Sequence, residues 1–241
     1  MMFEFLIISD CHYDSKNHQS LALLNRALEY VKKCNKIDKL FILGDICNEP
    51  TECNYIDFER QFLMRGINKD IYALAGNHDN LELMKSSFKN IRVEEDVKFS
   101  NFNIVMIDSS KKPFSKMPLG SGRVNETDIN RIKDITESSI LIIHHPVLEV
   151  GSEKFKSIAI ENRYDVERAV LNNKNIKYIL CGHGHSFMKS RKNNLIQYMS
   201  PSTAYGFDHK DNIKLVKTAS TGLLKVSVHQ DELFIKEVLF N

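Results

Sequence analysis

The stretch Leu74-Ala-Gly-Asn-His-Asp-Asn80 joins the end of a short apolar run to an amide, an imidazole and a carboxylate in consecutive positions. Glycine, asparagine and aspartate are common turn residues, so this stretch alone is compatible with an ordinary turn. The same side chains also ligate metals and transfer protons. Which interpretation holds depends on what the chain places at the ends of its other apolar runs.

Six short apolar runs predict β-strands, and several of them are continuous in Ile, Leu and Val. Continuous apolar runs are typical of strands that are buried on both faces. The predicted strands are Glu4–Ser9, Lys39–Leu43, Ile71–Ala75, Ile104–Ile107, Ile140–Ile143 and Lys177–Cys181.

Polar segments with helical periodicity lie between these strands. In Gln19–Cys34, apolar residues recur at helical spacing, which is typical of a crossover helix. Asn125–Ile135 shows the same spacing, with Asn125 as a candidate N-cap and acidic residues in the first turn. Asn162–Asn172 is a third predicted helix. Alternating strands and helices predict an α/β domain.

The last fifth of the sequence differs, because its apolar and polar residues alternate. Leu195–Met199, Leu223–His229 and Leu233–Leu239 predict antiparallel strands, and the link His229-Gln-Asp-Glu232 suits a hairpin. No internal repeat, low-complexity tract or Pro/Gly-rich linker divides the sequence. We therefore expect a single domain over residues 1–241.

Composition narrows the class of protein. The 241 residues are 42% hydrophobic and 27% charged, which is typical of a globular chain that can bury a sizeable core. The net charge of +2 gives no electrostatic argument for nucleic acid or an acidic membrane as a partner. Five cysteines without a CxxC pair favour a reducing cytoplasm over a disulfide framework. The N-terminal MMFEFLIISD is not typical of a secretory signal, and no apolar run is long enough to span a bilayer.

Residues with chemical function follow five of the apolar runs, in the motifs SDCH, LGD, GNHD, IIHHP and CGHGH. Ligands of open α/β sheets bind outside the carboxyl ends of the strands, so these motifs are expected to meet at one edge. Each motif alone is weak, since a histidine after a strand is usually structural, but the five together favour a metal site. Residues i and i+2 of a strand point the same way, so Asp10 and His12 are expected to reach one ion, and His183 and His185 have the same spacing.

The motifs DCH, GD, GNHD, HHP and GHGH, which run from Asp10 to His185, resemble the motif series of the calcineurin-like metallophosphoesterases. GRVNETDINRI, IAIENRYDVERAV and SPSTAYGF more loosely resemble segments of bacterial phosphodiesterases of this superfamily, the last two those of the class III cyclic nucleotide phosphodiesterases and the related glycerophosphodiesterases. The resemblance implies a four-layer αββα sandwich of two mixed β-sheets flanked by helices. It also implies a site for two divalent metal ions.

Carried over residue by residue, the resemblance assigns seven ligands. The first ion would be held by Asp10, His12 and His185. The second would be held by Asn77, His144 and His183, and Asp45 would bridge the two ions. His144 is chosen over His145 because the ligand of the family lies two residues before the proline, here Pro146. His145 is then expected to have a supporting or structural role.

The implied activity is the hydrolysis of a small phosphodiester by a metal-bridging hydroxide, with His78 as the proton donor to the leaving alkoxide. Asp79 is expected to orient its neighbours. The first substrate expected is a 3′,5′-cyclic nucleotide, with glycerophosphodiesters, phosphomonoesters and nucleotide pyrophosphates as alternatives. A DNA nuclease is less favoured because the charge is nearly balanced, and a non-enzymatic metal-binding scaffold because every ligand position is filled.

Mixed nitrogen and oxygen ligands accept several metals, and manganese or iron are expected ahead of zinc, cobalt or nickel. Asn162 and Tyr205, with Phe207, are candidate contacts for the substrate. A helix cap at Asn162 and core packing of the two aromatic residues are the alternatives.

Overall fold

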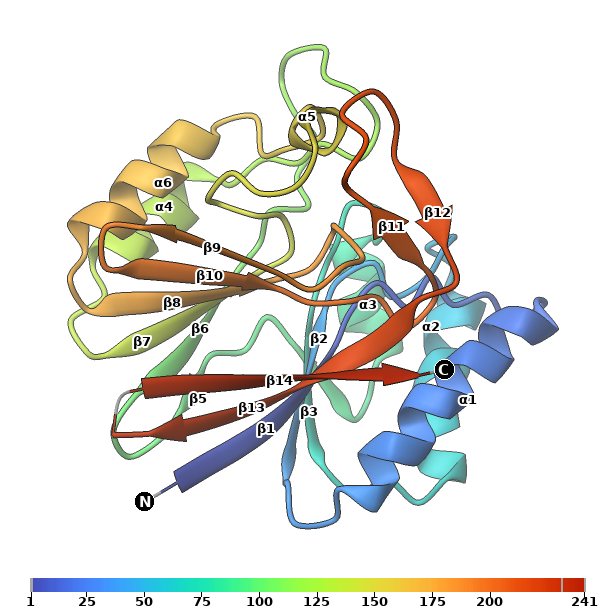
Figure 1. Cartoon of the computed structure of the whole chain (residues 1–241). Helices are drawn as coiled ribbons and strands as arrows, with labels where there is room; N and C mark the ends of the chain where they lie inside the picture. The colour runs from blue at the N-terminus through green and yellow to red at the C-terminus, as the bar shows by residue number, and fades with distance from the viewer. Residues whose placement is uncertain (1, 231, 241) are drawn as a thin grey trace.

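Two six-stranded sheets pack face to face, and helices cover both outer faces (Figure 1). The structure is a computed structural model, and it describes residues 2–230 and 232–240. The predicted four-layer αββα sandwich is therefore confirmed. Among the described residues, no helix has the length and apolar character needed to cross a bilayer.

The first sheet has the order β14-β13-β1-β2-β3-β4. Its strands are β1 (Met2–Ile8), β2 (Lys39–Leu43), β3 (Asp70–Leu74), β4 (Ile91–Val93), β13 (Thr221–His229) and β14 (Glu232–Phe240). β1 to β4 are parallel, whereas β13 pairs antiparallel with both β1 and β14. The predicted hairpin link joins β13 to β14, and its Asp231 lies outside the described residues. The pairing of β13 with β1 supports the proposal of a single domain.

The second sheet has the order β5-β6-β7-β8-β10-β9. Its strands are β5 (Val97–Lys98), β6 (Asn103–Ile107), β7 (Ser139–Ile143), β8 (Ile176–Cys181), β9 (Met188–Lys192) and β10 (Leu195–Met199). The prediction that Leu195–Met199 belongs to an antiparallel region was wrong on one side. β10 is antiparallel to β9 but parallel to β8, because the β9–β10 hairpin inserts its second strand next to β8. Alternating apolar and polar residues indicate that one face of a strand is buried, but they do not indicate whether the neighbouring strands are parallel or antiparallel.

Helices α1 (His18–Lys33), α2 (Glu52–Met64) and α3 (Leu81–Ser87) cover the first sheet, and α4 (Glu126–Lys133) and α6 (Arg163–Asn172) cover the second (Figure 1). The predicted spacing in α1 buries Leu24, Leu28 and Val31. Asn125 does occupy the N-cap position of α4, but its side chain makes no capping hydrogen bond there. A single short turn, α5 (Glu153–Lys156), and a two-stranded ribbon, β11 (Gly206–Asp208) and β12 (Val216–Thr218), lie at one end of the molecule.

The buried residues of β1 explain why the parallel strands are continuous apolar runs. Leu6 and Ile8 pack in the core under α1 to α3, whereas Phe5 and Ile7 pack between the two sheets. Successive side chains of a strand point to opposite faces, so a strand buried on both faces needs apolar residues at every position. The rings of Phe5 and Phe41, on the paired strands β1 and β2 of the first sheet, meet edge to face at 5.1 Å within this layer between the sheets.

Glu94, which directly follows β4, carries a buried carboxylate oxygen without a hydrogen-bond partner in the described chain. Burial, followed by the nearby Asp108, raises the pKa of Glu94 to about 7. Lys85, whose Nζ lies 3.4 Å away, offsets only part of this. The folded state therefore holds a proton that the unfolded chain releases near its ordinary pKa, so stability falls as the pH rises from there to about 7.

We expect Glu94→Gln to remove this pH dependence and to raise the free energy of unfolding by roughly 1–2 kcal/mol at pH 8, because a neutral amide avoids the buried charge. Urea unfolding at pH 5 and pH 8 measures the change, and the gain should vanish at pH 5. Equal effects at the two pH values would contradict the explanation.

Candidate metal centre

Left-handed backbone conformations position most of the predicted ligands. Positive φ angles of 41° to 71° occur at five of them: Asp10, His12, Asp45, His183 and His185. Such angles are uncommon for residues other than glycine and cluster at functional sites. Since β1 ends at Ile8 and β8 at Cys181, the i and i+2 pairs lie in loops and not on strands. The predicted reason for their convergence was therefore wrong, and the loops turn these side chains toward the site.

A first group of donor atoms lies after β1, β2 and β8. Atoms of Asp10, His12, Asp45 and His185 all lie within 4.8 Å of one another, and all four residues are buried. The Nε2 atom of His185 is 3.1 Å from Nε2 of His12 and 3.3 Å from Oδ1 of Asp10. Because Nδ1 of His185 donates to the carbonyl of Tyr205 at 2.9 Å, its Nε2 presents a lone pair to the group.

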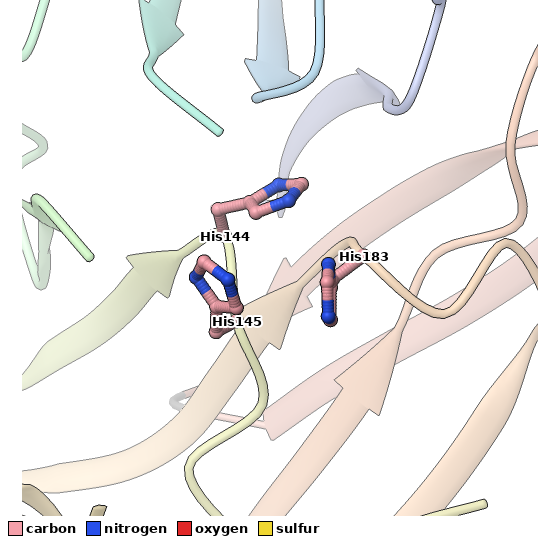
Figure 2. Close-up of side chains that lie close together, drawn as sticks. All are labelled: His144, His145 and His183. Carbon is pink, nitrogen blue, oxygen red and sulfur yellow. The ribbon is translucent and has the colours of Figure 1, made fainter. Parts of the chain in front are cut away.

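A second group lies after β7 and β8, and Figure 2 shows its three imidazoles: His144, His145 and His183. The Nδ1 atom of His144 donates to the carbonyl of Leu43 at 2.7 Å. Its Nε2 atom lies 3.2 Å from Oδ1 of Asn77 and presents a lone pair when the ring is neutral. His183 donates from Nε2 to the carbonyl of Ile158, which leaves its Nδ1 available as a ligand.

The adjacent His145 has both ring nitrogens engaged. Its Nε2 donates to the carbonyl of Gly120 at 2.9 Å, and its Nδ1 accepts from the hydroxyl of Ser109 at 2.9 Å. Burial lowers the pKa of His145 to about 3, so the ring is neutral. With neither nitrogen free, His145 supports the loop, and the geometry favours His144 as the ligand of this pair.

Asp45 lies between the two groups. Its Oδ2 atom is 3.8 Å from Nε2 of His12 and 3.5 Å from Nε2 of His144, which belong to different groups. Its Oδ1 atom accepts the backbone N–H of His78 at 2.8 Å. One carboxylate is thus held where it can serve both groups.

The charge balance of the two buried carboxylates fits divalent cations. Burial disfavours ionisation of Asp10 and Asp45, yet the histidines His185 and His144 outweigh it and hold both pKa values below the ordinary range. Within residues 2–230 and 232–240, no lysine or arginine nitrogen lies within 4.0 Å of either carboxylate. The histidines lower these pKa values only when they are protonated, and as neutral metal ligands they cannot offset the buried negative charge. Bound divalent cations would complete this donor set.

Close backbone packing requires glycine beside these carboxylates. A Cβ atom on Gly76, the glycine of the GNHD motif, would lie 2.2 Å from Oδ1 of Asp45. A Cβ atom on Gly182 would lie 2.2 Å from Oγ of Ser9, the hydroxyl that donates to Asp10. Any larger residue at either position would displace a carboxylate from the site.

Asp79 joins the GNHD loop to the loop after β2. Its carboxylate accepts the N–H groups of Gly76 at 2.9 Å, Ile46 at 3.1 Å and Cys47 at 3.3 Å. The hydroxyl of Tyr55 on α2 donates to the same carboxylate at 3.0 Å. Burial, followed by Asp45, raises the pKa of Asp79 to about 6, while these donors favour the ionised form. These contacts agree with the predicted orienting role.

His78 is exposed and lies beside the first group. Its ring meets the ring of His12 edge to face, with the centroids 4.8 Å apart. Its Nδ1 donates to the carbonyl of Asn48 at 3.2 Å, which leaves Nε2 for exchange of a proton. Solvent access and nearness to the donor groups are what a proton donor to a bound substrate needs.

The two predicted substrate contacts have different positions. Tyr205 lies against the first group, with its ring stacked on His12 at 5.3 Å. Asn162 does not reach the histidines through its described contacts, because its amide is occupied by the backbone of Val124. Asn162 occupies the N-cap position of α6, but its side chain makes no capping hydrogen bond there and instead holds the segment before α4. Its contact with substrate stays a prediction.

Several supporting residues were missed. The hydroxyl of Ser202 donates to the carbonyl of Asp10 at 2.8 Å, and the N–H of Thr203 donates to the carbonyl of Ser9. The stretch SPST resembles a segment of related phosphodiesterases, but the sequence did not reveal that its Ser202 and Thr203 hold the loop that carries Asp10. The carbonyls that orient the histidines could not be found in the sequence, because every residue has one.

The fold has two mixed sheets between helical layers, and aspartates and histidines gather after its strands. This combination defines a class of phosphoester hydrolases. The family described as calcineurin-like phosphoesterase matches residues 3–187, and the chain belongs to this family.

Related proteins and structures agree with this class. The chain is 27% identical to a probable cyclic nucleotide phosphodiesterase of Colwellia psychrerythraea over 85% of this chain and 82% of that protein. It is 22% identical to the 3′,5′-cyclic adenosine monophosphate phosphodiesterase CpdA of Escherichia coli K12 over 97% of this chain and 88% of that protein. A dimetal phosphatase from Danio rerio has the same fold, with a TM-score of 0.64, 13% identity and coverage of 98% and 95% of the two chains.

Proposed function

We propose that this chain is a metal-dependent phosphodiesterase that hydrolyses a small phosphodiester, and that a 3′,5′-cyclic nucleotide is its first candidate substrate. The observation that carries the proposal is the convergence of two groups of donor atoms that share Asp45. The names of the two relatives support the choice of a cyclic nucleotide.

In this proposal, seven side chains hold two divalent cations, with manganese or iron ahead of zinc, cobalt and nickel. One group is Asp10, His12 and His185, the other is Asn77, His144 and His183, and Asp45 serves both. The cations would neutralise the phosphodiester and lower the pKa of a water. Asn77 contributes a neutral oxygen, so it adds no negative charge beside the anionic substrate.

The chain supplies the surroundings of the substrate. A cleft of about 440 Å³ opens beside His12, and its walls include Tyr205, Lys217, Asn48 and Asn17. This volume falls in the range of small-molecule sites. The Tyr205 ring offers a stacking surface for a base, the amides offer hydrogen bonds to a sugar, and the Lys217 ammonium, 3.5 Å from the centroid of the Tyr205 ring, favours an anion.

The proposal is tested by assaying metal-reconstituted protein with bis-p-nitrophenyl phosphate and then with cyclic nucleotides, glycerophosphodiesters, phosphomonoesters and nucleotide pyrophosphates. We expect metal-dependent turnover, with cyclic nucleotides ahead of the others. Turnover no higher than that of a chain lacking the Asp45 carboxylate would favour a metal-binding scaffold. Faster hydrolysis of a glycerophosphodiester would reject the substrate and keep the reaction.

His78 is the proposed proton donor to the leaving alkoxide, and the nature of the leaving group tests this role. We expect His78→Ala to lower kcat about a hundredfold or more for a substrate with an alkoxide leaving group. The loss should be much smaller for bis-p-nitrophenyl phosphate, because p-nitrophenolate leaves without being protonated.

Metal content, measured by elemental analysis, should not change in His78→Ala, because the residue is not a proposed ligand. His18→Ala, on the exposed start of α1, is the matched control and should keep full activity on both substrates. Equal losses on the two substrates would remove His78 from this role.

A further inference from the structure

The most exposed large apolar side chains of the described residues lie at one end of the molecule. Leu119 is 98% exposed, Phe114 is 86% exposed and Ile213 is 85% exposed. Large apolar groups that are presented to water beside one another commonly mark a contact surface. Figure 1 shows the segments that carry them near α5 and the β11–β12 ribbon.

Three segments form this surface, and we call residues 111–120, 152–158 and 209–219 together the loop crown. The segments are contiguous. The ring of Phe155 meets that of His209 at 4.9 Å, and the N–H of Glu153 donates to Asn212 at 3.3 Å. Met117 lines a pocket of about 270 Å³ together with Phe155. The crown is thus one surface and not three separate loops.

The crown adjoins the candidate metal centre. Its residues Gly120 and Ile158 accept hydrogen bonds from the imidazoles of His145 and His183. His209 donates to the carbonyl of Gly184, which lies between two proposed ligands. A partner bound to the loop crown would therefore lie next to the candidate metal centre.

The crown is strongly basic, although the chain is nearly neutral. It contains eight lysines and two acidic residues, hence a charge of +6, whereas the whole chain carries +2. Only two of the lysines pair with a carboxylate in the described part of the chain. The other six are exposed: Lys112, Lys116, Lys154, Lys210, Lys214 and Lys217. The argument from net charge against an acidic membrane therefore does not apply to this surface, since averaging hides the asymmetry.

The loop that carries Phe114 is held in place, and lysines lie close to Phe114 and Ile213 in the sequence. Glu161 accepts the N–H groups of Phe114 and Ser115 at 3.0 and 2.7 Å, so this loop tip has a fixed shape. Lys112 and Lys116 flank Phe114, and Lys214 follows Ile213. An apolar tip between lysines suits the boundary between lipid chains and anionic headgroups. A nucleic acid would use the lysines but leave the three apolar side chains in water.

We propose that the loop crown docks on the surface of an anionic lipid bilayer, with Phe114, Leu119 and Ile213 entering the interface and the lysines contacting headgroups. Docking turns the edge with the candidate metal centre toward the membrane. The proposal rests on exposure and charge, and it does not depend on the identity of the substrate.

Co-sedimentation of the full chain with vesicles tests the proposal. We expect binding to phosphatidylcholine vesicles that contain about one third phosphatidylglycerol, weakening with added salt, and little binding to pure phosphatidylcholine. The triple variant Phe114→Ser, Leu119→Ser and Ile213→Ser should bind these anionic vesicles at least about tenfold more weakly. Lys112→Glu, Lys116→Glu and Lys214→Glu together should abolish binding; Lys217 is left unchanged because it lines the cleft.

Matched controls carry the same kinds of change elsewhere. Ile56→Ser, Leu63→Ser and Met64→Ser remove exposed apolar side chains from α2 and should bind vesicles like the unchanged chain. The proposal would be overturned if the unchanged chain did not bind anionic vesicles. It would also be overturned if the triple serine variant of the crown bound them as well as the unchanged chain does. Turnover of bis-p-nitrophenyl phosphate in solution should be the same for both crown variants, and it tests the proposed function separately from docking.

Discussion

Asp45→Asn is expected to lower phosphodiesterase turnover by about a thousandfold, because it removes the charge that both groups of donor atoms share. In the structure, Oδ2 of Asp45 faces His12 and His144, while Oδ1 holds the N–H of His78. An amide can preserve only one of these arrangements, since it has a single acceptor oxygen. Metal content should fall below two ions per chain, as measured by elemental analysis after gel filtration.

The control for this change is Asp134→Asn, an exposed aspartate at the end of α4. It alters the net charge by the same amount and should leave turnover and metal content unchanged. If Asp45→Asn kept both two ions and most of its activity, the shared carboxylate would not be part of the machinery. Loss of activity with two ions retained would restrict Asp45 to the reaction itself.

Asp79→Ala should reduce the free energy of unfolding by about 3–5 kcal/mol, a large effect for a residue that is not a proposed ligand. The change leaves three backbone N–H groups and the hydroxyl of Tyr55 without their acceptor. Those donors belong to the loop after β2, the GNHD loop and α2. We therefore expect the two ligand loops to separate, with metal affinity falling alongside stability.

Urea unfolding, followed by far-ultraviolet circular dichroism, measures this loss. Asp134→Ala serves as the exposed control and should change stability by less than about 0.5 kcal/mol. A loss of under about 1 kcal/mol for Asp79→Ala would mean that water replaces the carboxylate at the four donors.

The strands could be predicted well from the sequence because most of them are buried on both faces. Lys39–Leu43 and Leu195–Met199 have their predicted bounds, and the other predicted strands differ by one or two residues. Short edge strands such as β4 and β5 were missed, because two or three residues carry no periodicity. α2 was missed although Tyr55, Phe58 and Phe62 lie at helical spacing, since charged residues between them obscure the pattern.

The donor residues could be chosen from the sequence, but the way in which they meet could not. Motif order pointed to the side chains, whereas the left-handed turns at Asp10 and His183 appear only in the structure. His183 and His185 belong to different groups of donor atoms in the structure. The resemblance implied this division, whereas the spacing of the two residues in the sequence did not. The pairing of the Asn162 amide with the backbone of Val124 likewise could not be found in the sequence.

The pairing of β13 with β1 has a consequence for the order of assembly during synthesis. Of the strands described, β1 is synthesised before the others, yet one of its edges stays unpaired until β13 has been made. Ser202, which secures the Asp10 loop, also arrives late. A nascent chain that has not yet reached β13 consequently has an open strand edge that invites misassembly, and its candidate metal centre still lacks the hydrogen bond from Ser202.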